Sequence, residues 1–410
     1  MNVVVVGGGP AGMLAAAEAA QAGARVLLLE QNEKLGKKLY ITGKGRCNVT
    51  NACDRDGFFA AVVHNPRFLY SAFAAFDNRD LMALLERLGV PLKTERGGRV
   101  FPVSDKSSDI LRAMERHVRQ SGAEVRLHTR VTGLETEGGA LRAVRTERET
   151  IPCDAAILAT GGRSYPQTGS TGDGYRFARE TGHAVEAARG ALVPLVTREA
   201  WPQTLSGLTL RNVTLSAFRG DRRLHASEPG ELLFTHFGVS GPLVLTLSSL
   251  LQDDPSGVRL AIDLKPGLTA QQLDARLLRE LEANRQKQLA GALHALLPER
   301  LLLRVLEEAG VDARQRASEF TRAARAALCG ALKGLPLTVA GARPIDEAIV
   351  TRGGVSVRDI QPRTLMSRRV AGLYFAGELI DVDAVTGGYN LQIAWSTGAL
   401  AGRSVCSSND

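Results

Sequence analysis

The sequence has few of the features that mark nucleic-acid-binding proteins. Aromatic residues make up only 5% of the 410 residues, and no run of five or more like charges occurs, so the formal net charge of +8 is dispersed along the chain. A nucleic-acid surface usually combines a basic cluster with aromatic residues that stack on bases. We therefore expect a small-molecule substrate and no nucleic-acid partner.

Cysteine clusters and long apolar runs are also absent. The five cysteines are scattered and form no Cys-x-x-Cys pair, and the histidines lack metal-ligand spacing, so we predict neither a disulfide framework nor a metal site. No apolar run approaches the ~18 residues that a membrane span needs, and no signal-peptide pattern follows Met1. The expectation is a cytoplasmic protein without a membrane partner. The oligomeric state is not indicated.

What the sequence does have is a strong βαβ pattern at its start. Residues 3–6 predict a strand, residues 13–22 an alanine-rich helix that Gly23 ends, and residues 25–29 a second strand. Between the first strand and the helix lies a Gly-x-Gly-x-x-Gly motif formed by Gly7, Gly9 and Gly12. Such a motif lets the backbone approach a pyrophosphate at a helix N-terminus.

Glu30 ends the second strand, where an acid can accept hydrogen bonds from the adenosine ribose and would repel a 2′-phosphate. The sequence therefore predicts an α/β fold with a Rossmann-type dinucleotide-binding domain.

Later segments favour FAD over NAD as the dinucleotide. A helix is expected around Ile110 to Val118 after the cap-rich residues 107–109, then a strand pair at 124–127 and 141–145, and then a buried strand at 155–159. That strand ends at Thr160-Gly161-Gly162. A last strand at 372–377 leads through Glu378 and a glycine turn to a helix that begins near Asn390 and could face the flavin. A longer cofactor would use all three glycine-rich segments.

The middle of the chain has a different texture. Apolar and polar residues alternate at 213–218 and 258–264, which predicts half-buried antiparallel strands. Between Thr269 and about Leu332 the apolar period becomes helical. Thr269 and Gln272 predict a capping box, followed by an apolar stripe of Leu273, Leu277, Leu278 and Leu281. Because single cores stop growing at roughly 250 to 300 residues, several domains are expected.

These motifs together resemble the BaiN-like family of bacterial NAD(P)/FAD-dependent oxidoreductases and, more distantly, fumarate-reductase-type flavoproteins. The resemblance runs along the whole chain. It is carried by residues 5–12, 37–51, 159–162 with 169–174, 234–242, 353–355, 375–381 and 387–392.

The resemblance implies a split architecture. An FAD-binding Rossmann-type domain would comprise residues 1–190 and 346–410, an inserted β-rich substrate domain residues 191–266 and 334–345, and a helical cap residues 267–333. It also implies that the loop from Thr42 to Asn48 lines the FAD. The full set of expected FAD contacts is Gly7, Gly9, Pro10, Ala11, Gly12, Glu30, Gln31, Lys38, Thr42, Gly43, Gly45, Arg46, Cys47, Asn48, Val131, Thr160, Gly161, Gly162, Gly377, Glu378, Gly388, Tyr389, Asn390 and Leu391.

Two residue types in that loop have alternative readings. Lys44 and Arg46 could neutralise phosphates or simply form a solvated basic loop. Cys47 could be a small packing residue or a redox centre, although no resolving cysteine is near in sequence except Cys53.

The expected activity is the reduction of a C=C bond in a small organic substrate, with NAD(P)H as a transient electron donor. No second strand-glycine-helix unit for a nicotinamide domain is present. His236, Tyr389 and Asp381 are the candidate proton donors by motif position alone. The alternatives are an FAD-dependent amine oxidase that uses O₂ and a flavin-containing RNA-modification or binding protein.

Overall fold

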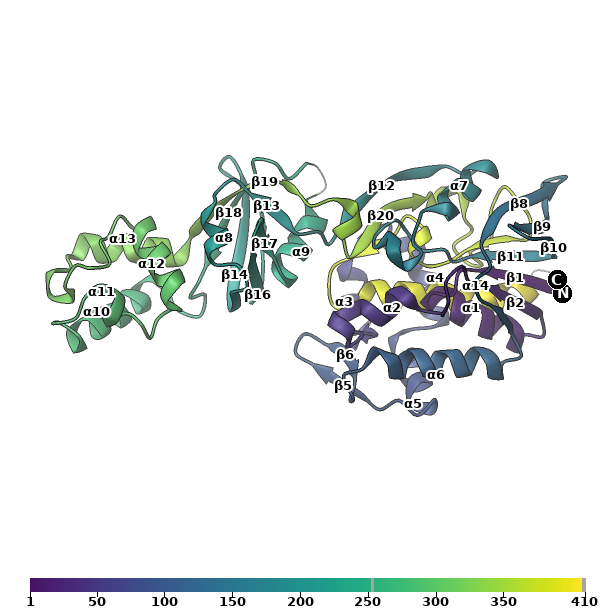
Figure 1. Ribbon diagram of the computed structural model, residues 1–410, viewed down its shortest axis with the longest axis horizontal. Helices are drawn as coiled ribbons and strands as arrows, with labels where there is room; N and C mark the ends of the chain where they lie inside the picture. The colour runs from purple at the N-terminus through teal and green to yellow at the C-terminus, as the bar shows by residue number, and fades with distance from the viewer. Residues whose placement is uncertain (252–253, 408–410) are drawn as a thin grey trace. The chain divides into compact units, whose positions relative to one another are not determined.

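The computed structural model describes residues 1–251 and 254–407. The chain folds into two compact units (Figure 1). Unit 1 combines Met1–Ala191 with Ile345–Asp410, and unit 2 is the continuous segment Leu192–Pro344. Each unit has its own hydrophobic cluster. In the part of the chain that the structure describes, no helix is both long and apolar enough to cross a bilayer.

Unit 1 is built on a five-stranded parallel sheet with the order β21-β11-β1-β2-β7. The strands are β1 (Asn2–Val6), β2 (Arg25–Leu29), β7 (Glu124–Arg126), β11 (Ala155–Leu158) and β21 (Leu373–Phe375). The central strands are almost entirely buried, as expected when helices and loops cover both faces of a parallel sheet. The predicted α/β Rossmann-type fold is confirmed.

Three long helices accompany this sheet: α1 (Pro10–Gln21), α6 (Ser107–Gln120) and α14 (Tyr389–Ser407). Helix α1 packs against both α14 and α6. Residues 107–109, expected to cap α6, lie inside its first turn instead. The hydroxyl of Ser107 is used elsewhere, because it donates a 2.7 Å hydrogen bond to the carbonyl of Tyr40.

The predicted pairing of residues 124–127 with 141–145 is wrong. Strand β7 extends the parallel sheet beside β2, whereas β9 (Ala140–Thr146) lies between β8 (Val131–Glu137) and β10 (Thr150–Pro152) in an antiparallel sheet. Gly138 and Gly139 both have positive φ, which suits the tight turn between β8 and β9. Strand β9 therefore pairs with its neighbours along the chain, β8 and β10, and not with β7.

Three small antiparallel sheets complete unit 1, and two of them join its early and late segments. They comprise β3 (Thr50–Asn51), β6 (Arg99–Pro102) and β5 (Leu92–Glu95); β12 (Val185–Ala191) with β20 (Val350–Val355); and β4 (Val62–His64) with β22 (Asp383–Ala384). The shorter helices are α2 (Lys37–Ile41), α3 (Arg55–Ala61), α4 (Tyr70–Ala75), α5 (Asn78–Arg87) and α7 (Asp173–Glu180).

Unit 2 contains an antiparallel barrel. Its strands are β13 (Leu195–Thr197), β14 (Thr209–Arg219), β16 (Gly230–Thr235), β17 (Gly238–Ser240), β18 (Arg259–Asp263) and β19 (Leu335–Ala342), and pairing of β14 with β18 closes the ring. Strand β15 (Arg222–Ala226) pairs with β14 outside the ring. Two short helices, α8 (Trp201–Thr204) and α9 (Pro242–Leu250), pack on the barrel strands.

Four helices between β18 and β19 share the hydrophobic cluster of the barrel: α10 (Ala270–Ala283), α11 (Leu289–Ala292), α12 (Glu299–Glu308) and α13 (Arg322–Lys333). The predicted capping box of Thr269 and Gln272 is confirmed. Leu273, Leu277 and Leu281 are buried, but the expectation for Leu278 is wrong, because its side chain lies one position off this stripe and is 44% exposed.

Candidate functional site

The glycine turn between β1 and α1 is close-packed on one side and open on the other. Gly7 has φ +105°, and a Cβ there would lie 2.5 Å from the carbonyl oxygen of Ala159. A Cβ on Gly12 would overlap the carbonyl of Gly7, whereas a Cβ on Gly9 would meet no atom within 4 Å. Helix α1, with Pro10 and Ala11 in its first turn, has no side-chain cap. Its free N–H groups can therefore bind an anion at the open side.

Glu30 is buried at the end of β2, where its carboxylate holds the surrounding turns. One oxygen accepts a 2.8 Å hydrogen bond from the N–H of Gly8, and the other accepts bonds from the backbone and side chain of Asn32. Gln31 donates to the carbonyl of Gly169, and Val131 is buried at the start of β8. The acid is therefore fixed beside the glycine turn.

Two of the three glycine-rich segments meet at an ion pair between residues far apart in the chain. Lys38 Nζ lies 2.7 Å from Glu378 Oε2 and 2.6 Å from the hydroxyl of Ser164. The other Glu378 oxygen accepts hydrogen bonds from Ser164 and from the N–H of Thr351. A Cβ on Gly162 would lie 2.8 Å from Glu378, so Gly162 and the Gly377-Glu378 turn are packed closely together. The loop after β11 therefore lies beside Glu378.

Two of the expected FAD contacts, Thr160 and Gly377, pack against neighbouring helices. The hydroxyl of Thr160 is buried, has no hydrogen-bond partner among the described residues, and packs against Gly174 in α7. Gly161 has φ +73°, and a Cβ on Gly377, where φ is +74°, would lie 2.9 Å from the Cβ of Ala11. These contacts place the end of β11 next to α7 and the end of β21 next to the start of α1.

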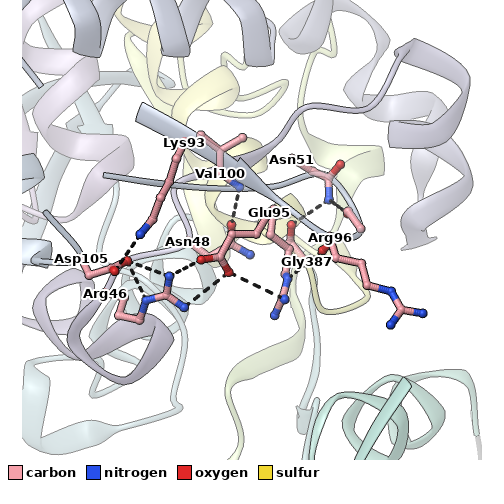
Figure 2. A network of polar contacts seen from close by, with 11 residues as sticks. Arg46, Asn48, Asn51, Lys93, Glu95, Arg96, Val100, Asp105 and Gly387 are labelled. Atoms are coloured by element: carbon pink, nitrogen blue, oxygen red, sulfur yellow. Dashed lines mark hydrogen bonds and ion pairs between the residues drawn. The ribbon is translucent and has the colours of Figure 1, made fainter. Parts of the chain in front are cut away.

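The loop from Thr42 to Asn48 is held by carboxylates (Figure 2). Arg46 forms ion pairs with Glu95 and Asp105, and its guanidinium lies 4.1 Å from the ring centroid of Phe101. Lys93 also binds Asp105, at 2.7 Å. Lys93 and Arg46 donate to the carboxylate of Asp105 and hold its pKa below the ordinary value. Arg46 is therefore engaged with protein groups.

The rest of this loop has an irregular backbone. Gly43, Lys44, Gly45 and Cys47 all have positive φ, and Lys44 is exposed. The Thr42 hydroxyl donates to the carbonyl of Leu39, and the Asn48 side chain accepts from the N–H of Val100 (Figure 2). Cys47 is fully buried, and burial raises the pKa of its thiol to about 12. This thiol therefore packs in the core and is not activated as a redox group.

The start of α14 lies against the early segments of unit 1. A Cβ on Gly388 would overlap the carbonyl of Thr50, and Asn51 donates to the carbonyl of Gly387 (Figure 2). The Asn390 side chain accepts from the N–H and donates to the C=O of Ala384, which closes the loop before the helix. Leu391 packs on the hydrophobic core at this end of the helix. The glycine turn thus fits closely over β3.

The three candidate proton donors belong to different units. Tyr389 and Asp381 belong to unit 1, whereas His236 is an exposed residue in the turn between β16 and β17 of unit 2, with its ring 4.9 Å from that of Phe237. Burial raises the pKa of Tyr389 to about 12, and the side chain of Cys53 is its hydrogen-bond partner. Burial also raises the pKa of Asp381.

Sequence reasoning missed a histidine in this region. His64 Nδ1 lies 2.7 Å from Oδ1 of Asp383, a carboxylate that is only 1% exposed. The two residues are 319 positions apart, and His64 lies in no glycine-rich or acidic motif that could have singled it out.

Together these features define an FAD-dependent oxidoreductase. The open, uncapped start of α1, the acid at the end of β2 and the late glycine turn at α14 fit a dinucleotide with a flavin at its far end. The chain belongs to the HI0933-like family, whose Rossmann-domain model matches residues 1–404. The predicted BaiN-like resemblance is thereby confirmed.

Curated relatives match over almost the entire chain. The chain is 32% identical to a 3-dehydro-bile acid delta(4,6)-reductase from Clostridium scindens, with 98% of each protein covered. It is also 32% identical to a ribosomal RNA dihydrouridine synthase from Escherichia coli, with 97% of this chain and 96% of the relative covered.

Solved structures share the fold at low identity. A 3-ketosteroid delta1-dehydrogenase from Sterolibacterium denitrificans aligns with a TM-score of 0.55 at 15% identity over 99% of both chains. A 3-ketosteroid-delta4-(5alpha)-dehydrogenase from Rhodococcus jostii aligns with a TM-score of 0.54 at 16% identity, over 98% of this chain and 96% of the other.

Proposed function

We propose that the protein reduces a C=C bond conjugated with a carbonyl group, with NAD(P)H as electron donor to its FAD. The observation that carries this proposal is the chemistry common to the two full-length relatives. A 3-dehydro-delta(4) bile acid is an enone, and dihydrouridine arises when the C=C bond next to a uracil carbonyl is saturated. In both substrates a hydride can add to the carbon β to a carbonyl.

The residues described above would hold the cofactor in distinct ways. The start of α1 binds the pyrophosphate, Glu30 lies where the ribose is expected, and the N-terminus of α14 provides partial positive charge. Bound flavin supplies a hydride from its N5. The remaining FAD contacts named from the sequence, including Lys38 and Glu378, form part of this proposal.

The test is anaerobic absorbance spectroscopy of the purified protein. We expect a flavin spectrum that bleaches with NADH or NADPH and returns when a steroid 4-en-3-one or a uridine-containing RNA is added. Bleaching by an organic amine and recovery only with O₂ would instead identify an oxidase. A protein that cannot be reconstituted with FAD would overturn the proposal.

A second candidate substrate is a uridine of ribosomal RNA, contrary to our sequence-based expectation of no nucleic-acid partner. Besides the name of the Escherichia coli relative, one surface favours it. Arg219, Arg222, Arg223 and Arg259 are exposed on β14, β15 and β18, and Arg259 lies 4.7 Å from the ring centroid of Phe218. We call these five residues the β14–β15 basic cluster; Phe218, Arg223 and Arg259 are cross-strand partners, and Arg219 pairs with Arg222 on the opposite side of the sheet. They combine phosphate-binding charge with an aromatic ring.

Charge reversal in the β14–β15 basic cluster distinguishes the two substrate classes. The double variant R222E/R223E should weaken binding of a ribosomal RNA fragment and lower the slope of log K against log salt by about one per lost phosphate contact. The matched control is R314E/R316E, which reverses two other exposed arginines of unit 2. Equal RNA binding by both variants, with turnover of the steroid enone intact, would assign a small-molecule substrate.

A further inference from the structure

A histidine and a buried carboxylate form a dyad in unit 1 that the functions assigned above leave unused. Asp383 accepts from His64 Nδ1 at 2.7 Å, and its second oxygen lies 3.6 Å from Nη2 of Arg352. A carboxylate that is only 1% exposed needs such partners, because an isolated buried charge is costly. The arginine balances the carboxylate, and the carboxylate orients the imidazole.

The dyad has one nitrogen anchored and one available. The His64 side chain is 28% exposed, and its Nε2 makes no hydrogen bond within the described residues. A carboxylate on Nδ1 fixes the ring orientation and keeps the proton on Nδ1, so Nε2 is the nitrogen that exchanges protons with a ligand.

The dyad is fixed directly to the loop that opens α14. Strands β4 and β22 pair through Asp383 and His64, and Ala384 is held by the Asn390 side chain at the start of the helix. The next residue, Asn65, has φ +53° and donates from its amide to the carbonyl and the carboxylate of Asp381. The position of His64 therefore depends on the same segment that forms the late glycine turn.

We propose that His64 is the acid that protonates the substrate, with Asp383 as its positioning residue; this rests on the proposed C=C reduction. Bound flavin, reduced beforehand by NAD(P)H, would supply one hydride, and with it two electrons, to the β carbon. The π pair moves to the α carbon next to the carbonyl. That carbon takes the proton from Nε2 of the imidazolium, which then regains a proton from water.

The other acids of this region are less suited to the step. The hydroxyl of Tyr389 is paired with the thiol of Cys53. Both the backbone carbonyl and the carboxylate of Asp381 are taken up by the amide of Asn65, which donates to them at 2.6 and 3.1 Å. Among the described residues, neither is hydrogen-bonded to a buried carboxylate as His64 is to Asp383.

The experiment separates the two half-reactions in stopped flow. In H64N, flavin reduction by NADPH should stay within about threefold of wild type, whereas reoxidation by the enone should slow by about 10²–10⁴-fold, as for loss of a general acid. H294N, which makes the same change at an exposed histidine of unit 2, is the matched control and should retain reoxidation, whereas D381N tests the competing acid. Imidazole added to H64A should restore part of the rate.

A second readout does not depend on turnover. In ¹⁵N-edited NMR of the protein, with the His64 signals identified by their absence in H64N, Nδ1 should carry the proton. In D383N that preference should be lost. Reoxidation of H64N at the wild-type rate, or a loss confined to D381N, would overturn the assignment. A wild-type enzyme that reduces no enone or uridine would instead overturn the proposed function.

Discussion

Gly398 in α14 lies against the backbone of Ala11 in α1, so closely that a Cβ on Gly398 would be 2.9 Å from the Ala11 carbonyl carbon. One turn later, a Cβ on Gly402 would lie 2.5 Å from the carbonyl oxygen of Ala15. The two glycines are four residues apart and therefore share one face of the helix. The last helix thus packs on the first through bare backbone, and the ion pair of Arg403 with Glu18 flanks the contact.

Replacing either glycine should force the two helices apart. We expect G398A or G402A to lower the free energy of unfolding by about 1–3 kcal/mol, the usual cost of overpacking. Because Ala11 is in the first turn of α1, FAD affinity should fall as well. Denaturant unfolding and flavin titration measure the two effects. Variants with wild-type stability would show that the backbones can separate without cost.

The opposite sign is expected for a glycine with room around it. Gly330 is an exposed residue inside α13, and no atom lies within 4 Å of a Cβ built there. Because glycine is a poor helix former, G330A should raise the free energy of unfolding by about 0.5–1 kcal/mol. This variant serves as the internal control for G398A and G402A. A destabilised G330A would contradict the packing of α13.

The ion pair of Lys38 with Glu378 should matter more than an exposed pair. Both side chains are about one-fifth exposed, whereas Glu33, the partner of Lys37, is 52% exposed. E378Q leaves Lys38 beside a neutral group and should cost about 1–3 kcal/mol, compared with less than about 0.5 kcal/mol for E33Q. FAD affinity should fall only in E378Q. Thermal unfolding of both apoproteins and flavin binding test this difference.

His183 should make the stability of the protein fall in mild acid. Its ring is buried, with Nε2 2.7 Å from the hydroxyl of Ser367, and burial lowers the pKa of the imidazole. The unfolded chain binds the proton near its usual pKa of about 6.5, so the stabilising contribution is present above that pH and is lost as pH decreases below it.

We therefore expect a fall in Tm between pH 7.5 and 5.5 that is smaller in H183Q. His294, which is exposed, provides the control variant H294Q, whose Tm should follow that of wild type. An identical fall in H183Q and wild type would assign the acid sensitivity to other groups.

The parts that sequence reasoning predicted are those in which the signal is local. Gly7, Gly12 and Glu30 lie within one βαβ segment, and the capping box of Thr269 and Gln272 spans a single turn. The strands at 124–126 and 140–146 were both predicted, but their pairing partners were not. The alternation of apolar and polar residues along a strand does not specify which strand pairs with it.

The site was harder to predict for the same reason. The charge on Arg46 suggested a phosphate or a solvated loop, whereas its guanidinium forms ion pairs with Glu95 and Asp105. No sequence pattern between residues 46 and 95 predicts these ion pairs. The pairing of His64 with Asp383 depends on β4 meeting β22, a strand of two residues. Short, distant pairings leave no periodicity in the sequence.

The division of the chain also imposes an order on its synthesis. Unit 2 is an uninterrupted segment, whereas unit 1 lacks β21 and α14 until residues 373–407 have left the ribosome. Until then, the edge of β11 has no partner and the alanine face of α1 is uncovered, while unit 2 already has every strand of its barrel. The nascent nucleotide-binding half is therefore the segment most in need of chaperone protection, and FAD can stabilise it only after α14 has been synthesised.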